Sequence, residues 1–139
     1  MARLVVYGRS SFCPDMYRWK KWVEQHPLDY VEFDIDRDDE AYDKVIGWTG
    51  HESVPTLVIA LDDGVDPIEE PRPLGDRSPR AFDRGTMLTE PNLGQIAPFL
   101  QRHSIPFGGE GGSEGGSAEA RVERASGEPP SGWRRLLGI

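Results

Sequence analysis

The sequence predicts a single α/β domain in which one layer of β-sheet is flanked by helices, in the order β-α-β-α-β-β-α. Three observations favour this fold class. Short apolar runs alternate with segments of helical spacing along residues 1–103. Proline, aspartate and glycine stand where the helices would begin or end. The length of 139 residues is typical of one domain.

The first three elements are expected within residues 4–35. Residues 4–7 form a short apolar run that ends at Gly8, which indicates a buried strand. Pro14 stands at the first position of a helix whose apolar spacing continues through residues 16–26. Apolar and polar side chains alternate over residues 30–35, which predicts a second strand.

The remaining elements follow the same rules. A helix is expected over residues 38–48, with acidic residues at its start and Gly50 just after its end. Residues 54–61 predict a third strand, and residues 86–88 a fourth. The last helix, over residues 92–102, begins with Asn92 and Gln95 as a capping box.

Two segments stand outside this pattern. Residues 62–85, between the third and fourth strands, form a long insertion rich in Asp, Pro and Arg. It is read as a solvated loop that points away from Pro55, and as a partner surface rather than a lid. Residues 104–139 are rich in Gly, Ser and Glu and predict a flexible tail after a domain of residues 1–103. The tail ends in a short apolar and basic segment around Trp133, which is either a docking peptide or a frayed end.

Charge and composition exclude several classes of function. A net charge of −8 and a pI near 4.8 disfavour a partner that is nucleic acid or an anionic membrane surface. No apolar run is long enough for a transmembrane segment. The single cysteine forbids an internal disulfide, so we expect a cytoplasmic location. The histidines show no metal-ligand spacing, and His51 is the one expected near Cys13.

Cys13 is the residue expected to carry chemistry. It directly precedes Pro14, so its sulfur would face the positive end of a helix dipole and unpaired backbone N–H groups. That environment favours the thiolate over the thiol. Arg9 would strengthen this effect if it turned toward the sulfur, whereas Asp15 opposes it. The alternative is a buried and inert cysteine.

Pro55 is the second candidate. A proline at the head of an apolar strand is either an entry residue or part of a cis peptide bond. A cis bond would leave the backbone of Val54 able to pair with an extended substrate chain.

Together these residues resemble a glutaredoxin. The resemblance rests on Val5-Val6-Tyr7, the turn to Cys13-Pro14-Asp15-Met16, residues 49–55 and the late Leu88-Thr89-Glu90-Pro91-Asn92 segment. It covers about residues 3–103 and is closest to the mycoredoxin and NrdH-redoxin branch. It implies a thioredoxin fold with a mixed four-stranded sheet, Cys13 as nucleophile and Pro55 as the cis-proline beside it. The thiol-binding residues it implies are Arg9, Phe12, Pro14, Val54, Pro55, Thr89 and Asn92.

The chain departs from the family pattern at the place of the resolving cysteine. The usual Cys-x-x-Cys has become Cys-Pro-Asp-Met, so Met16 stands where the second cysteine would be. A monothiol cycle remains, in which an external thiol resolves the mixed disulfide. The residues expected around glutathione are also altered, because Arg9 lies four positions before Cys13 and Glu52 would repel a carboxylate.

Three functions follow as alternatives. The favoured one is a glutaredoxin-like thiol–disulfide oxidoreductase or deglutathionylase. No permanently bound cofactor is expected, and glutathione or another low-molecular-weight thiol would serve as co-substrate. Disulfide-containing proteins are the expected substrates. The second is a degenerate redoxin fold that recruits a protein through residues 62–85 or the tail. The third is an iron–sulfur or Cu(I) module, the latter using Cys13 and Met16.

Overall fold

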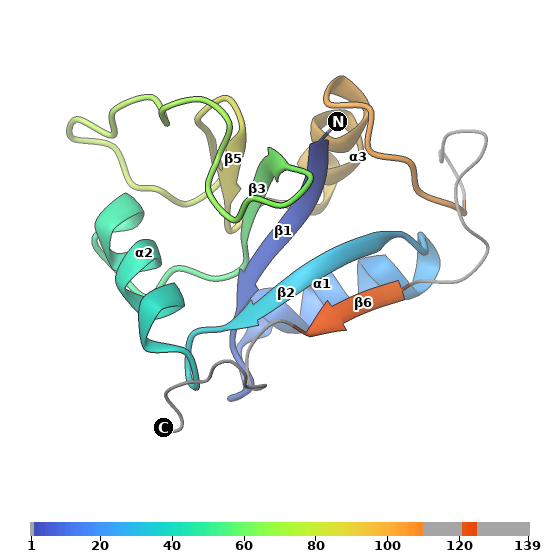
Figure 1. Ribbon diagram of the computed structural model, residues 1–139, viewed down its shortest axis with the longest axis horizontal. Helices are drawn as coiled ribbons and strands as arrows, with labels where there is room; N and C mark the ends of the chain where they lie inside the picture. The colour runs from blue at the N-terminus through green and yellow to red at the C-terminus, as the bar shows by residue number, and fades with distance from the viewer. Residues whose placement is uncertain (1, 110–120, 125–139) are drawn as a thin grey trace.

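The computed structural model describes residues 2–109 and 121–124 (Figure 1). Its helices and strands follow the predicted order, with a short strand added before the fourth strand expected from the sequence and another after the last helix. The strands are β1 (Ala2–Gly8), β2 (Asp29–Asp34), β3 (Thr56–Leu61), β4 (Phe82–Asp83), β5 (Met87–Thr89) and β6 (Arg121–Arg124). The helices are α1 (Pro14–Gln25), α2 (Asp39–Thr49) and α3 (Leu93–Arg102).

The sheet is mixed and has six strands in the order β4-β5-β3-β1-β2-β6. The expected number of four is therefore wrong. The sheet is mixed, as the resemblance implied, since β1 pairs with β2 in parallel and with β3 antiparallel. The two additions lie at the edges, where β4 pairs with β5 and the backbone of β6 runs parallel to β2. Two-residue β4 lies inside the insertion, and four-residue β6 inside the predicted tail.

Helices cover both faces of the sheet. Figure 1 shows α1 and α3 behind the central strands and α2 on the opposite side. Alternation along β1 matches this arrangement. Tyr7 turns toward α2, where its ring contacts Phe33 and Trp48 at centroid distances of 5.2 Å. Gly8 faces α1, and its neighbour there is Met16. Because both faces are covered, residues 4–7 are fully buried.

Packing continues past the boundary expected at His103. Ile105 is buried, and the fully buried Phe107 lies 5.3 Å from the Trp22 ring. Gly109 approaches the backbone of Gln25 so closely that a Cβ atom would overlap its carbonyl, and its φ is +79°. The compact unit therefore runs to Gly109. The segment around Trp133 lies outside the described residues.

The insertion is fastened to the domain at its start. Arg3 donates to the carbonyl of Gly64 at 2.6 Å, and the Tyr7 hydroxyl donates to the carbonyl of Val65. The Lys44 ammonium lies 2.8 Å from a carboxylate oxygen of Asp66. These contacts hold the first residues after β3 over the α2 face. Among the described residues, no helix has the length and apolar character needed to cross a bilayer.

Candidate functional site

The turn between β1 and α1 is organised by one carboxylate. Asp36 accepts hydrogen bonds from the amides of Ser10 and Ser11 at 3.1 and 2.9 Å, and from the Ser11 hydroxyl at 2.9 Å. The Arg9 guanidinium lies 2.8 Å from the other oxygen of the same carboxylate. The hydrogen bond from Arg9 and those from Ser11 hold the pKa of Asp36 well below its ordinary value. Asp36 thereby fixes the loop that carries Cys13.

Cys13 is the N-cap residue of α1. Its backbone is extended, with φ −152° and ψ 125°, and its carbonyl accepts the amide of Tyr17 at 2.9 Å. The side chain makes no capping hydrogen bond, and it is partly buried against the core. Pro14 follows at the first helical position, as predicted. The sulfur therefore stands at the N-terminal end of a 12-residue helix, where the dipole favours an anion.

Met16 stands where a resolving cysteine would be, and it is a core residue. It is 3% exposed. A Cβ atom built on Gly8 would lie 2.5 Å from Met16 Cε and 3.0 Å from Sδ. The absence of a side chain at Gly8 therefore makes the room that Met16 fills. The Met16 sulfur is packed against β1, which does not favour the Cu(I) site suggested for Cys13 and Met16.

The Val54–Pro55 peptide bond is cis. The Pro55 carbonyl accepts the amide of Glu90 at 2.8 Å, which joins the head of β3 to the loop after β5. Val54 itself is only 1% exposed. Its backbone is thus covered in this conformation, and pairing with an extended substrate would require the covering groups to move.

The end of the insertion reaches this site, contrary to the expectation that the insertion points away. The chain turns back before β4, so that Phe82 pairs with Thr89 and the Ala81 amide donates to the Thr89 carbonyl at 2.8 Å. Thr89 in turn pairs with Thr56, next to Pro55. The prediction considered only where β3 ends and missed that β4 runs back along β5. Arg80 is delivered to the Cys13 site by this return.

Arg80 joins two carboxylates there. Its guanidinium donates to both oxygens of Asp15, at 2.7 and 2.9 Å, and lies 3.2 Å from an oxygen of Glu90. The pKa of Asp15 is lowered chiefly by the hydrogen bond from Arg80. The pKa of Glu90 is raised, first by burial, although Arg80 acts against this. The charge of Cys13 is among the causes that raise the pKa of Arg80, behind those of Asp15 and Glu90.

Arg9, which would strengthen the thiolate if it turned toward the sulfur, is paired with carboxylates. It lies between two carboxylates, 2.8 Å from Asp36 and 3.1 Å from Glu52. The negative charge of Glu52, expected to repel a substrate carboxylate, is therefore partly neutralised by Arg9. The sequence did not indicate that Arg80 pairs with Asp15 and Glu90. The signal available was only the number of arginines in the insertion.

The other predicted thiol-binding residues differ in exposure. Phe12 is 83% exposed beside Cys13. Thr89 is fully buried, and its hydroxyl lies 3.2 Å from that of Thr56. Asn92 forms the expected capping box, with its backbone N–H donating to Gln95 Oε1 at 3.0 Å. Phe12 is thus available to a partner, whereas Thr89 and Asn92 hold the neighbouring loop and helix.

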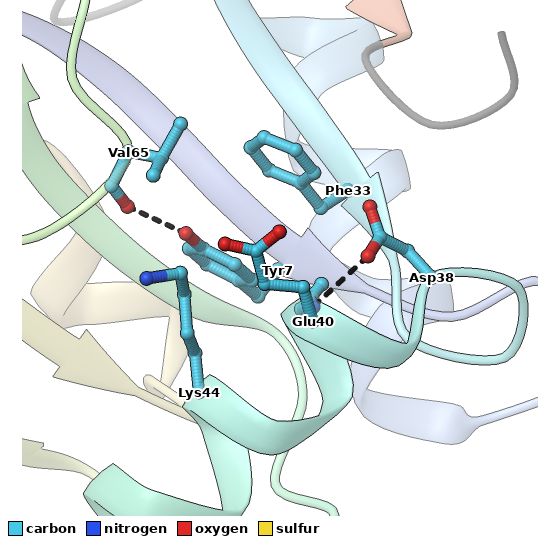
Figure 2. Close-up of a pocket in the computed structure, with 7 residues that line it drawn as sticks. Tyr7, Phe33, Asp38, Glu40, Lys44 and Val65 are labelled. Atoms are coloured by element: carbon cyan, nitrogen blue, oxygen red, sulfur yellow. Dashed lines mark hydrogen bonds between the residues drawn. The ribbon is translucent and has the colours of Figure 1, made fainter. Parts of the chain in front are cut away.

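A separate small pocket lies on the α2 face. Figure 2 shows the rings of Tyr7 and Phe33 at its base, with Glu40 and Lys44 reaching over them from α2. Its volume is about 180 Å³, below the usual range for ligand sites. Burial and the nearby acidic residues raise the pKa of Tyr7, so its hydroxyl stays protonated and donates to Val65. The pocket borders the contacts that Tyr7 and Lys44 make with the start of the insertion.

Comparison with known proteins gives one family. Residues 4–62 match the glutaredoxin family model, a range that includes Cys13 and Pro55 and ends before Arg80. Neither a curated protein nor a solved structure matches the chain. The matched range, with a cysteine before α1 and a cis-proline before β3, supports the glutaredoxin family, its thioredoxin fold and a redox function of the thiol–disulfide oxidoreductase type.

Proposed function

We propose that the protein catalyses thiol–disulfide exchange through Cys13 alone, with an external thiol completing each cycle. The observation that carries the proposal is the position of Cys13 as N-cap of α1, with its sulfur not used in capping. A thiolate there is stabilised by the helix dipole and is free to attack a disulfide. Met16, buried in the core, offers no second thiol.

The cycle has two exchange steps. In the first, the Cys13 thiolate attacks the disulfide between a protein thiol and a low-molecular-weight thiol. The protein leaves as its thiolate, and a mixed disulfide forms between Cys13 and the small thiol. In the second, another molecule of the small thiol attacks this mixed disulfide as its thiolate. The Cys13 thiolate is restored, and the two small thiols leave joined by a disulfide. The small thiol is thus the reductant.

The identity of the small thiol is open among glutathione, mycothiol and bacillithiol. We expect the reaction to take place in the cytoplasm, where thiols are kept reduced. A similarity to the mycoredoxin and NrdH-redoxin branch favours a donor other than glutathione.

The alternatives receive less support. The Cu(I) module would use the sulfurs of Cys13 and Met16, and the Met16 sulfur is packed against Gly8 in the core. A binding module without catalysis would leave the free thiol at a helix start unexplained.

Turnover assays on the full chain test the proposal. The substrate is a peptide disulfide of each small thiol in turn, with the same thiol as reductant. We expect turnover with at least one thiol and none with Cys13→Ser. Turnover by Cys13→Ser equal to wild type, or no turnover above the uncatalysed rate with all three thiols, would overturn the proposal.

A further inference from the structure

The insertion supplies the cation of the Cys13 site. Arg80 lies at the end of residues 62–85, yet its guanidinium sits between Asp15 of the first turn of α1 and Glu90 of the loop after β5. Each contact is short, at 2.7 and 3.2 Å. The backbone of the same segment is held by an isolated bridge between Arg80 and Thr89. Backbone and side chain therefore both fix Arg80 here.

Two carboxylates would otherwise oppose the thiolate. Asp15 lies two positions after Cys13, and its side chain is only 13% exposed. Glu90 is 19% exposed and is held beside the cis-proline through its amide. Negative charges around a thiol disfavour its ionisation to an anion, and the charge of Cys13 acts on the same Arg80 that contacts both carboxylates. Arg80 compensates both, and Arg18 contributes a second contact to Asp15 at 2.7 Å.

We propose that Arg80 is a positioning residue for Cys13: it neutralises Asp15 and Glu90 beside the sulfur and ties the loop after β5 to the start of α1. The inference rests on the proposed function for its biological meaning. It gives the insertion a role in the site, since the helix and the strand-entry proline belong to the matched range and Arg80 does not.

The charged groups around the site come from five segments. Asp15 and Arg18 belong to α1, Arg80 to the insertion and Glu90 to the loop after β5. His51, from the loop before β3, is close enough that its charge lowers the pKa of Glu90. Arg9 and Glu52 are paired with each other at 3.1 Å. Arg80 is thus the group that contacts both Asp15 and Glu90.

Alkylation of Cys13 by iodoacetamide tests this inference on the full chain. The reagent is uncharged, so its rate reports the fraction and reactivity of thiolate without steering by charge. We expect Arg80→Ala to lower the rate at pH 7 about fivefold, the effect of about one screened charge pair. The limiting rate at high pH, where the thiol is fully ionised, should stay within about twofold.

Three further variants separate charge from packing. Arg80→Ala combined with Asp15→Asn should recover a clear part of the lost rate, because one of the two carboxylates left uncompensated is gone. Arg80→Lys should retain an intermediate rate. Arg77→Ala is the matched control, since Arg77 lies in the same insertion and stacks on Phe82 at 3.8 Å. Arg77→Ala also removes one positive charge from the insertion, and its Cys13 should be alkylated at the wild-type rate.

The inference is overturned if Arg80→Ala alkylates within about twofold of wild type at pH 7, or if the double variant stays as slow as Arg80→Ala. Its failure differs from failure of the proposed function, because alkylation needs no disulfide substrate. A wild-type protein without turnover but with Arg80-dependent alkylation would contradict the proposed function only.

Discussion

Arg80 and Asp15 are 65 positions apart in the sequence and are joined by two hydrogen bonds of 2.7 and 2.9 Å. The pair connects the insertion to the helix that begins after Cys13. It also defines a contact whose strength depends on pH, because the pKa of Asp15 is lowered mainly by Arg80.

Arg80→Ala should therefore destabilise the protein at neutral pH and not in acid. The lowered pKa of Asp15 means that the pair stabilises the fold above the unfolded pKa, about 4, and that this contribution is lost as the pH falls. Arg80 is 52% exposed, so the loss at pH 7 should be only about 0.5–1 kcal/mol. Urea unfolding at pH 7 and pH 3 measures it. An undiminished difference at pH 3 would show that the effect comes from packing.

Met16→Cys should convert the site to a two-cysteine mechanism. Positions 13 and 16 are neighbours on one turn of helix, so the new thiol can attack a mixed disulfide at Cys13. In the variant, the thiol of the new cysteine should displace the small thiol from Cys13. An internal disulfide between positions 13 and 16 then forms, and no second molecule of the small thiol is needed. Intact mass after reaction with one equivalent of a mixed disulfide distinguishes the two products.

The same substitution should lower the stability of the reduced protein. Met16 is 3% exposed, and shortening a buried side chain costs about 1–3 kcal/mol. Met16→Leu serves as the control, because it keeps the side-chain volume and, like the wild type, has no thiol at position 16. An adduct that persists in Met16→Cys as long as in Met16→Leu would contradict the predicted access of position 16 to Cys13.

Gly8→Ala should destabilise the protein through Met16. The added Cβ would lie 2.5 Å from Met16 Cε, so the side chain must move within a closed core. Such overpacking costs about 1–3 kcal/mol. Gly47→Ala is the control, because a Cβ there meets nothing within 4 Å and lies in a helix. It should stabilise by about 0.5–1 kcal/mol. Equal effects of the two variants on thermal unfolding would argue against the close contact.

Asp36→Asn should loosen the turn that carries Cys13. The carboxylate accepts the amides of Ser10 and Ser11 and the guanidinium of Arg9. An amide offers one acceptor oxygen and no charge, so we expect a loss of about 1–2 kcal/mol at pH 7. Because the folded pKa of Asp36 is depressed, the loss should begin to shrink below about pH 4 and vanish only as the pH falls through that depressed pKa. Asp76→Asn, on the exposed part of the insertion, should change nothing. Protease cleavage within residues 9–12 gives a second measure.

Local sequence patterns predicted most of the fold. The central strands are short apolar runs, and α1 begins at Pro14 as expected. Helix α2 ends just before Gly50, which has a φ of +78°. The cis-proline expected from the resemblance is present at Pro55. The strands and the helix ends depend on neighbours in the sequence, and local propensity is sufficient to recognise them, whereas the cis bond was expected only from the resemblance.

The relationships that the sequence did not reveal are long-range. Arg80 reaches Asp15 only because two-residue β4 runs back along β5, and strands this short leave no periodicity to read. Arg9 pairs with Asp36 and Glu52, which follow other elements of the fold. Phe107 packs against Trp22, although it lies in the segment of residues 104–139, whose composition is otherwise that of a tail.

The central claim is that Cys13 alone carries the exchange and needs a thiol from outside. Intact-mass analysis of the full chain after reaction with a peptide disulfide of glutathione, mycothiol or bacillithiol tests it most directly. The account predicts a single adduct of the small thiol, located on Cys13, that persists until fresh thiol is added and then disappears with formation of the small-thiol disulfide. An unmodified Cys13 with all three disulfides would contradict it.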